Sequence, residues 1–157
     1  MLEVYPIGKA QVPEAFDVGV IRDSLGAMAA LPAELRRAVD GCRDLDHHIR
    51  EGAWSIRALV HHVADSHMNA YVRTKLALTE QSPTVKPYDE VAWSRLADSR
   101  LDPGPSLDLV EALHARWVTL LESLGPDELE RPWQMPGGGY YEIDLTGAQA
   151  VAGWTLH

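Results

Sequence analysis

Three histidines lie close together in the segment 61–67, which reads His-His-Val-Ala-Asp-Ser-His. The whole chain contains seven histidines. Neutral imidazole is the commonest metal ligand in proteins, and histidine is also the side chain that titrates nearest to neutral pH. The composition of this segment therefore predicts a metal site, an acid–base site or a solvated helix face.

Helix geometry separates the three histidines. Apolar residues recur at three- and four-residue spacing along this segment, and we place Val63 at the centre of their stripe. At roughly 100° per residue, His67 falls about 40° from that centre, His62 about 100° and His61 about 160°. The geometry predicts that His67 points inward, that His62 lies at the edge of the buried face and that His61 points away from the core.

These positions predict different roles. His62 is the best candidate for a metal ligand, because an edge position can face both a neighbouring helix and water. We expect His61 to be solvent-exposed and loosely paired with Asp65, which would otherwise serve as an acceptor behind the ligands. His67 is interpreted as a buried core histidine, a second ligand or a hydrogen-bond donor behind the ligands. His114, on a later helix, is predicted to point inward, either bonded to a backbone carbonyl or facing His62 across a pocket.

Helical periodicity accounts for most of the chain. The first pattern runs from about Ala15 to Leu31, where Pro32 is predicted to kink or break the helix, and Asp40-Gly41 ends the piece that follows. Two further long helices are predicted over 55–78 and 106–124, each with a serine as its N-cap.

The remaining elements complete a bundle. Pro103-Gly104-Pro105 predicts a linker, residues 140–143 a brief strand and residues 144–157 a last helix. Long amphipathic helices with little strand signal predict an all-α, up-and-down four-helix bundle, formed by a single domain over 1–157.

Composition excludes some classes of function. Lys and Arg number 14 against 23 Asp and Glu, and this net charge of -9 argues against binding to nucleic acid. A single cysteine, Cys42, cannot form an internal disulfide, and no leader or long apolar run is present, so we expect a cytoplasmic protein without a membrane partner. Five tryptophans against one phenylalanine are either chance or the aromatic walls of a pocket.

Several motifs occur in a characteristic order along the chain, namely Tyr5–Gly8, Trp54–Arg57, Val60–Tyr71, Lys75–Glu80, Pro83-Thr84, Lys86–Tyr88, Ala97–Ser99 and Leu113–Trp117. Together they resemble the YfiT branch of the DinB superfamily, over nearly the whole chain up to about residue 125. The longest motif, with the downstream Lys-Leu-Ala-Leu-Thr-Glu, is specific to that branch.

The resemblance implies a four-helix bundle that binds one divalent metal, zinc or nickel, through three histidines. One ligand comes from the helix of His61 and His62, and the other two from a His-x-x-x-His pair on the last helix. The resemblance also implies a cytoplasmic, homodimeric, metal-dependent hydrolase. Relatives in the wider superfamily transfer low-molecular-weight thiols, such as bacillithiol or mycothiol, onto small electrophiles.

The last helix departs from this pattern. Trp154 aligns with the family tryptophan, but Thr155 stands where a histidine is expected, and His157 is about one position away from the first histidine of the pair. The partner four residues later is not present, so we expect either a truncated last helix or a degraded site. His62 and His157 are the predicted ligands, with His67, His114 or a water completing the set.

Three functions follow from these observations. The first hypothesis is a metal-dependent hydrolase that attacks a small molecule with a metal-activated water. The alternatives are a metal-dependent transferase that moves a bacillithiol-like thiol onto an electrophile, and a catalytically inert dimeric bundle. Arg73 and Arg116 are candidates to receive an anionic group of the substrate.

Overall fold

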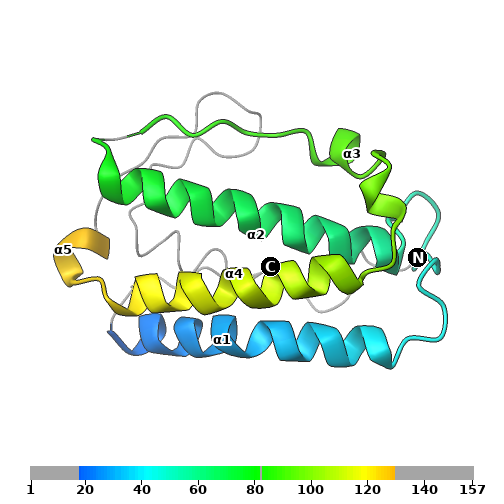
Figure 1. Cartoon of the computed structure of the whole chain (residues 1–157), viewed down its shortest axis with the longest axis horizontal. Coiled ribbons are helices and arrows are strands. Elements are labelled where there is room, and N and C mark those ends of the chain that lie inside the picture. Colours follow the sequence, from blue (N-terminus) through cyan, green and yellow to red (C-terminus); the bar gives the residue numbers. More distant parts are fainter. Residues whose placement is uncertain (1–17, 82, 130–157) are drawn as a thin grey trace.

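Three long helices form the body of the computed structural model, which describes residues 18–81 and 83–129. They are α1 (Val18–Asp40), α2 (Ile56–Thr79) and α4 (Gly104–Glu122), and they lie side by side (Figure 1). The short elements are α3 (Glu90–Trp93), η1 (Asp98–Arg100) and α5 (Pro126–Leu129). The all-α prediction is confirmed for the described residues, whereas the predicted strand over 140–143 and the last helix lie outside them. In the described part of the chain, no helix is both long enough and apolar enough to cross a membrane.

Helices α2 and α4 run in the same direction, and this differs from the predicted up-and-down succession. His61 near the start of α2 contacts Ser106 near the start of α4, at 2.7 Å. Towards the other end, Trp117 Nε1 donates to Thr74 Oγ1 at 3.2 Å. The parallel direction arises because the segment after α2 returns along its length before α4 begins, as residues 83–103 show (Figure 1).

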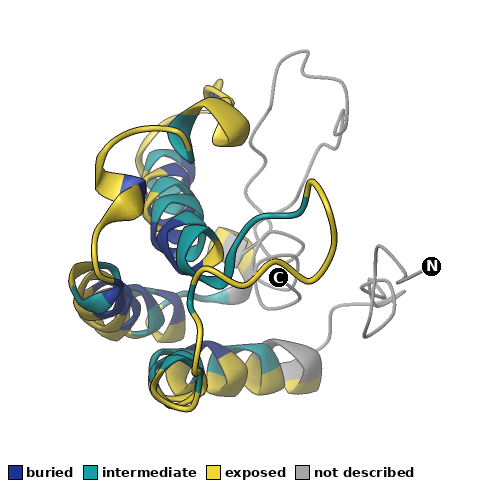
Figure 2. Cartoon of the chain, turned by 90° about the vertical axis from the view of Figure 1, so that its right-hand side faces the viewer, coloured by how far each residue is buried: buried dark blue, intermediate teal, exposed yellow. Residues whose placement is uncertain are grey.

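Helix α1 runs antiparallel to α4. The guanidinium of Arg36, late in α1, binds Asp108 at 2.7 Å and Glu111 at 3.1 Å, both early in α4. The carbonyl of Met28, nearer the start of α1, accepts a hydrogen bond from His114 farther along α4. Apolar residues between the three long helices form the core, and Figure 2 shows the buried positions facing inward. The main cluster comprises Met28, Ala70, Tyr71, Leu113, Trp117 and Leu121.

The predicted ends of the helices are mostly confirmed. Ser55 caps α2, because its side chain accepts a hydrogen bond from the backbone N–H of Ala58. Asp40 is the last residue of α1, as predicted. Ser106 was predicted to cap the third long helix, but α4 begins two residues earlier at Gly104, and the Ser106 hydroxyl bonds to His61 instead.

Of the two outcomes predicted at Pro32, a kink or a break, the break does not occur, since α1 continues through Pro32 to Asp40. Proline lacks the N–H that residue 32 would donate to the carbonyl of Met28, four residues earlier. In this protein the Met28 carbonyl receives a hydrogen bond from His114 Nδ1, at 2.6 Å. A donor from α4 therefore replaces the one that proline removes, and the packing of α1 on α4 stabilises a helix that local sequence disfavours.

Candidate metal centre

His62 lies half-buried on the second turn of α2, with 22% of its side chain exposed. Its ring packs edge-on against Trp54, with ring centroids 4.5 Å apart. Its Nε2 is 3.9 Å from a carboxylate oxygen of Glu90, the first residue of α3. This is the edge position that helix geometry predicts, where the imidazole contacts an aromatic ring and lies near a carboxylate.

A second aromatic pair lies on the segment that carries Glu90. Tyr88 and Trp93 flank Glu90 in the sequence, and their ring centroids are 4.5 Å apart. Trp54 thus contacts the His62 ring, as a residue of a pocket wall would, whereas Trp117 belongs to the core. The other two tryptophans are outside the described residues.

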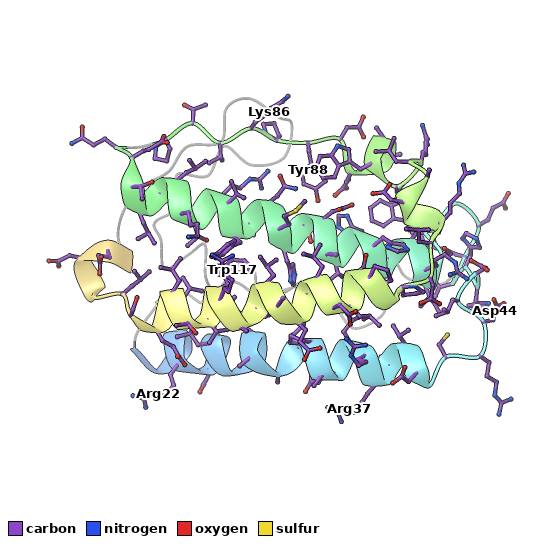
Figure 3. All side chains as sticks on the ribbon, in the orientation of Figure 1. Arg22, Arg37, Asp44, Lys86, Tyr88 and Trp117 are labelled. Atoms are coloured by element: carbon purple, nitrogen blue, oxygen red, sulfur yellow. The ribbon has the colours of Figure 1, made fainter. Side chains whose placement is uncertain are left out.

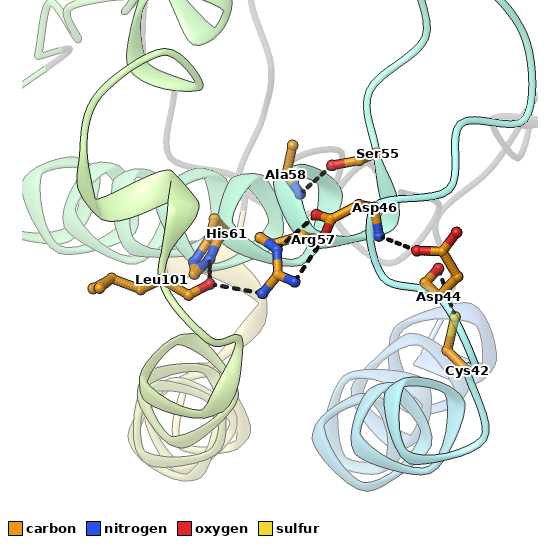
Figure 4. A network of polar contacts seen from close by, with 8 residues as sticks. All are labelled: Cys42, Asp44, Asp46, Ser55, Arg57, Ala58, His61 and Leu101. Carbon is orange, nitrogen blue, oxygen red and sulfur yellow. Dashed lines mark hydrogen bonds and ion pairs between the residues drawn. The ribbon is translucent and has the colours of Figure 1, made fainter.

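His61 is buried, with 6% exposed, so the prediction that it faces solvent is wrong. Its Nδ1 is 2.7 Å from Ser106 Oγ and its Nε2 is 3.1 Å from the carbonyl of Leu101 (Figure 4). Because a carbonyl can only accept, Nε2 donates to Leu101 and the neutral ring accepts from Ser106. The prediction assumed one buried face on α2, but the turn before α4 covers a second face. His61 therefore joins α2 to α4 through both ring nitrogens.

The same turn is held by Arg57 (Figure 4). Its guanidinium donates to both carboxylate oxygens of Asp46, at 2.8 and 3.2 Å, and to the carbonyl of Leu101 at 3.1 Å. The hydrogen bonds from Arg57 lower the pKa of Asp46. The loop before α2 and the turn before α4 are thereby tied to the end of α2 that carries His62.

Asp65 is half-buried one turn after His61 and His62. Burial raises the pKa of Asp65, the charge of Asp98 raises it further, and His61 lowers it. The expected pairing of Asp65 with His61 is therefore electrostatic, since both ring nitrogens of His61 bond elsewhere.

His67 and His114 form a buried pair in the core, with 3% and 2% exposed. His67 Nδ1 lies 2.7 Å from His114 Nε2, and His114 Nδ1 donates to the carbonyl of Met28 at 2.6 Å. Because the carbonyl only accepts, neutral His114 presents a lone pair at Nε2, so His67 donates from Nδ1 and keeps an acceptor at Nε2. The inward orientation of both histidines is confirmed. The alternative that His114 faces His62 is wrong, because α4 brings it to His67.

A cavity of about 130 Å³ adjoins this pair between the three long helices. Its lining is mostly apolar apart from the two histidines and one carboxylate, and it comprises Ala27, Met28, Leu31, Glu34, His67, His114 and Trp117.

The buried pair of His67 and His114 predicts that the protein loses stability in mild acid. Burial lowers the pKa of His114 below its ordinary value of 6.5, although the hydrogen bond to Met28 raises it in part. As the pH falls through 6.5, the unfolded chain therefore binds a proton that the folded chain does not, and stability declines by up to about 1.4 kcal/mol per pH unit for this group. We expect urea denaturation between pH 7.5 and 5.5 to show this slope, and His114→Gln to reduce it. The matched exposed variant His47→Gln should retain the slope, and equal slopes in the two variants would contradict the assignment.

The donor types at His62 suit a transition metal, because imidazole and carboxylate are both ligands of zinc. Within the residues that the structure describes, no group of three His, Cys, Asp or Glu side chains is arranged to hold a metal ion. His62 and Glu90 alone are too few for a tetrahedral site. The other predicted ligand, His157, lies outside the described residues.

Two neighbours of His62 were not identified from the sequence. From the sequence, Trp54 is recognised only as the first residue of the motif Trp54–Arg57, and Glu90 is not singled out at all. The sequence feature that could have pointed to Glu90 is the close spacing of Tyr88, Glu90 and Trp93 after Pro87. This spacing becomes informative only once residues 83–103 are known to return along α2.

Comparisons with known proteins agree with this arrangement. The chain is 43% identical over 153 residues to a protein of Geobacillus kaustophilus that bears the name "putative metal-dependent hydrolase", covering 96% of this chain and 85% of the relative. A protein of Bacillus mycoides with the same name is 42% identical over 152 residues, covering 96% and 87%.

The structure is similar to that of YfiT from Bacillus subtilis, described as "a probable metal-dependent hydrolase with an unusual four-helix bundle topology". The TM-score is 0.89 and the identity 39%, over 97% of this chain and 87% of that one. This likeness confirms the predicted four-helix bundle. The sequence profile of the DinB superfamily matches residues 27–157. With both the bundle and the sequence in agreement, this chain belongs to the DinB superfamily.

Proposed function

We propose that this protein is a metal-dependent hydrolase that acts on a small molecule at His62. The observation that carries the proposal is the half-buried imidazole of His62, held edge-on by Trp54 with a carboxylate 3.9 Å from Nε2. A ligand at such a position can bind a metal and still leave room for water and substrate. The names of the relatives support metal dependence and hydrolysis.

The residues around the site have distinct roles in this proposal. His62 binds zinc or nickel together with ligands from the last segment of the chain, among them His157. When bound, such a metal lowers the pKa of a coordinated water towards neutrality. Trp54 limits rotation of the His62 ring, which holds its lone pair in one direction. Glu90 accepts a proton from a water or substrate held beside His62.

The cellular setting follows from the same expectations. We propose a cytoplasmic homodimer whose partner is a small-molecule substrate, and not nucleic acid or a membrane. The acidic net charge of -9 and the single cysteine are consistent with this setting.

The test uses the full chain loaded with zinc or nickel and freed of excess metal. We expect stoichiometric metal by elemental analysis and metal-dependent hydrolysis of a chromogenic ester in the absence of thiol. Turnover that requires added bacillithiol, above the uncatalysed thiol reaction, would replace hydrolysis with thiol transfer. Metal content below about a tenth of an equivalent after loading would overturn the proposal in favour of an inert bundle.

A further inference from the structure

Arg73 is a buried arginine in the third quarter of α2, with only 8% exposed. Its Nη2 donates to the carbonyl of Lys86 at 3.0 Å. None of the ion pairs among the described residues includes Arg73. Guanidinium has five N–H donors and stays charged, and a buried charge without a counter-charge is costly. The position therefore carries a positive charge that the described residues do not neutralise.

Residues 83–89 cover this position and continue to the candidate metal centre. They run antiparallel to α2, since Lys86 contacts Arg73 and Glu90 lies beside His62. Val85 anchors the segment, with 1% exposed. Figure 3 shows Tyr88 on the side of the segment that faces α2, whereas Arg37 lies on the opposite side of the bundle.

Tyr88 follows Lys86, whose carbonyl binds Arg73, by two residues and precedes Glu90 by two, so it lies between the Arg73 end and the His62 end of the segment. Burial, Glu90 and Asp65 raise the pKa of Tyr88 to about 12, and Arg73 opposes them. The phenol therefore keeps its proton at neutral pH and can donate a hydrogen bond. Desolvation lowers the pKa of Arg73, as expected for a cation removed from water without a carboxylate partner.

We propose that Arg73 and the Tyr88 hydroxyl form a subsite for an anionic group of the substrate, a carboxylate or a phosphate. Guanidinium binds both groups through paired N–H donors, and the phenol supplies one more donor. Asp65 and Glu90 are acidic and lie toward His62, so the anion binds at the Arg73 end. The inference rests on the proposed function, because it identifies one end of the molecule that reacts at His62.

The spacing constrains the substrate. Eleven residues of α2 separate His62 from Arg73, or roughly 16 Å between their Cα atoms along the axis. Long side chains on a helix lean toward its N-terminus, which brings the guanidinium closer to His62. The substrate is therefore an extended molecule, with the reacting atom at one end and a carboxylate or phosphate at the other.

The experiment measures anion binding to the full chain after metal chelation, by thermal unfolding with inorganic phosphate or propionate. Sodium chloride at matched ionic strength serves as the reference. We expect one of the two anions to raise the Tm beyond chloride, and the comparison shows which group the subsite prefers. Arg73→Met should weaken binding of that anion by about tenfold or more, and Tyr88→Phe by less. Arg37→Met, the same change on the opposite exposed face, should leave binding unchanged.

A readout without ligand separates binding from a structural role. If Arg73 is an uncompensated charge, Arg73→Met should unfold at the same or a higher temperature than the parent in chloride alone, while losing the rise with phosphate or propionate. An equal loss of Tm with and without these anions would overturn the proposal, as would the absence of any rise beyond chloride in the parent protein. Because no metal is present, failure here leaves metal-dependent hydrolysis standing, and failure of hydrolysis leaves the anion result standing.

Discussion

Replacing His62 with alanine should lower bound zinc or nickel to below about a tenth of an equivalent and reduce hydrolysis at least a hundredfold, since even groups that only orient ligands cost about 10- to 100-fold. The physical reason is the loss of an imidazole that contacts both Trp54 and the Glu90 carboxylate. Elemental analysis after loading and the rate of ester hydrolysis provide the two measurements. The far-UV spectrum and Tm of the metal-free variant should match those of the parent, because His62 is not part of the core cluster.

The matched control is His47→Ala, which removes an exposed histidine from the loop before α2. It should bind metal and hydrolyse substrate like the parent. Full metal occupancy in His62→Ala would show that His62 is not a ligand. Loss of activity with metal retained would instead indicate that His62 acts on the substrate.

Replacing Trp117 with alanine should lower the free energy of unfolding by about 3–5 kcal/mol, the range for truncating a large buried aromatic side chain. Trp117 is 1% exposed and its Nε1 donates to Thr74 across α2 and α4. Its ring also meets His67 and His114 edge-on, at 6.2 and 6.0 Å between centroids. Urea denaturation at pH 7.5 measures the loss.

Two further variants refine this result. Trp117→Phe keeps most of the apolar volume but not the N–H donor, so it should cost less than the alanine variant. Leu109→Ala, at an exposed position on the same helix, should change stability by less than about 0.5 kcal/mol. A loss below 1 kcal/mol in Trp117→Ala would show that the three long helices do not depend on this side chain.

The periodicity of the sequence predicts the helices well because burial of one apolar stripe decides where each helix forms. Ser55 caps α2 and Asp40 is the last residue of α1, as local chemistry predicts. Pro32 is the exception, because a tertiary donor from α4 compensates for a local defect. The direction of α4 is also not predicted, since the return of residues 83–103 along α2 has no local signature in the sequence.

The candidate metal centre shows the same contrast between features that local sequence predicts and features that depend on tertiary contacts. The apolar stripe of α2 places both histidines correctly. His67 lies near the centre of the face that packs on the bundle, and His62 lies at the edge of that face. The prediction for His61 is wrong because the turn that carries Leu101 covers a second side of α2. A single apolar stripe in the sequence cannot reveal this second neighbour. Residues 83–90 return antiparallel along α2, which brings Lys86 to Arg73 and Glu90 to His62. Only the three-dimensional path of the chain reveals these contacts.

Pro32 has an effect that reaches beyond its own helix. Because Pro32 has no N–H to offer the Met28 carbonyl, that oxygen accepts from α4, and since a carbonyl only accepts, the hydrogen of His114 lies on Nδ1. The 2.7 Å contact then leaves His114 Nε2 as the acceptor and His67 Nδ1 as the donor, so one carbonyl of α1 sets hydrogen positions on both α4 and α2. Hydrogen positions on α4 and α2 are thus linked to a carbonyl of α1 that lies one turn before Pro32.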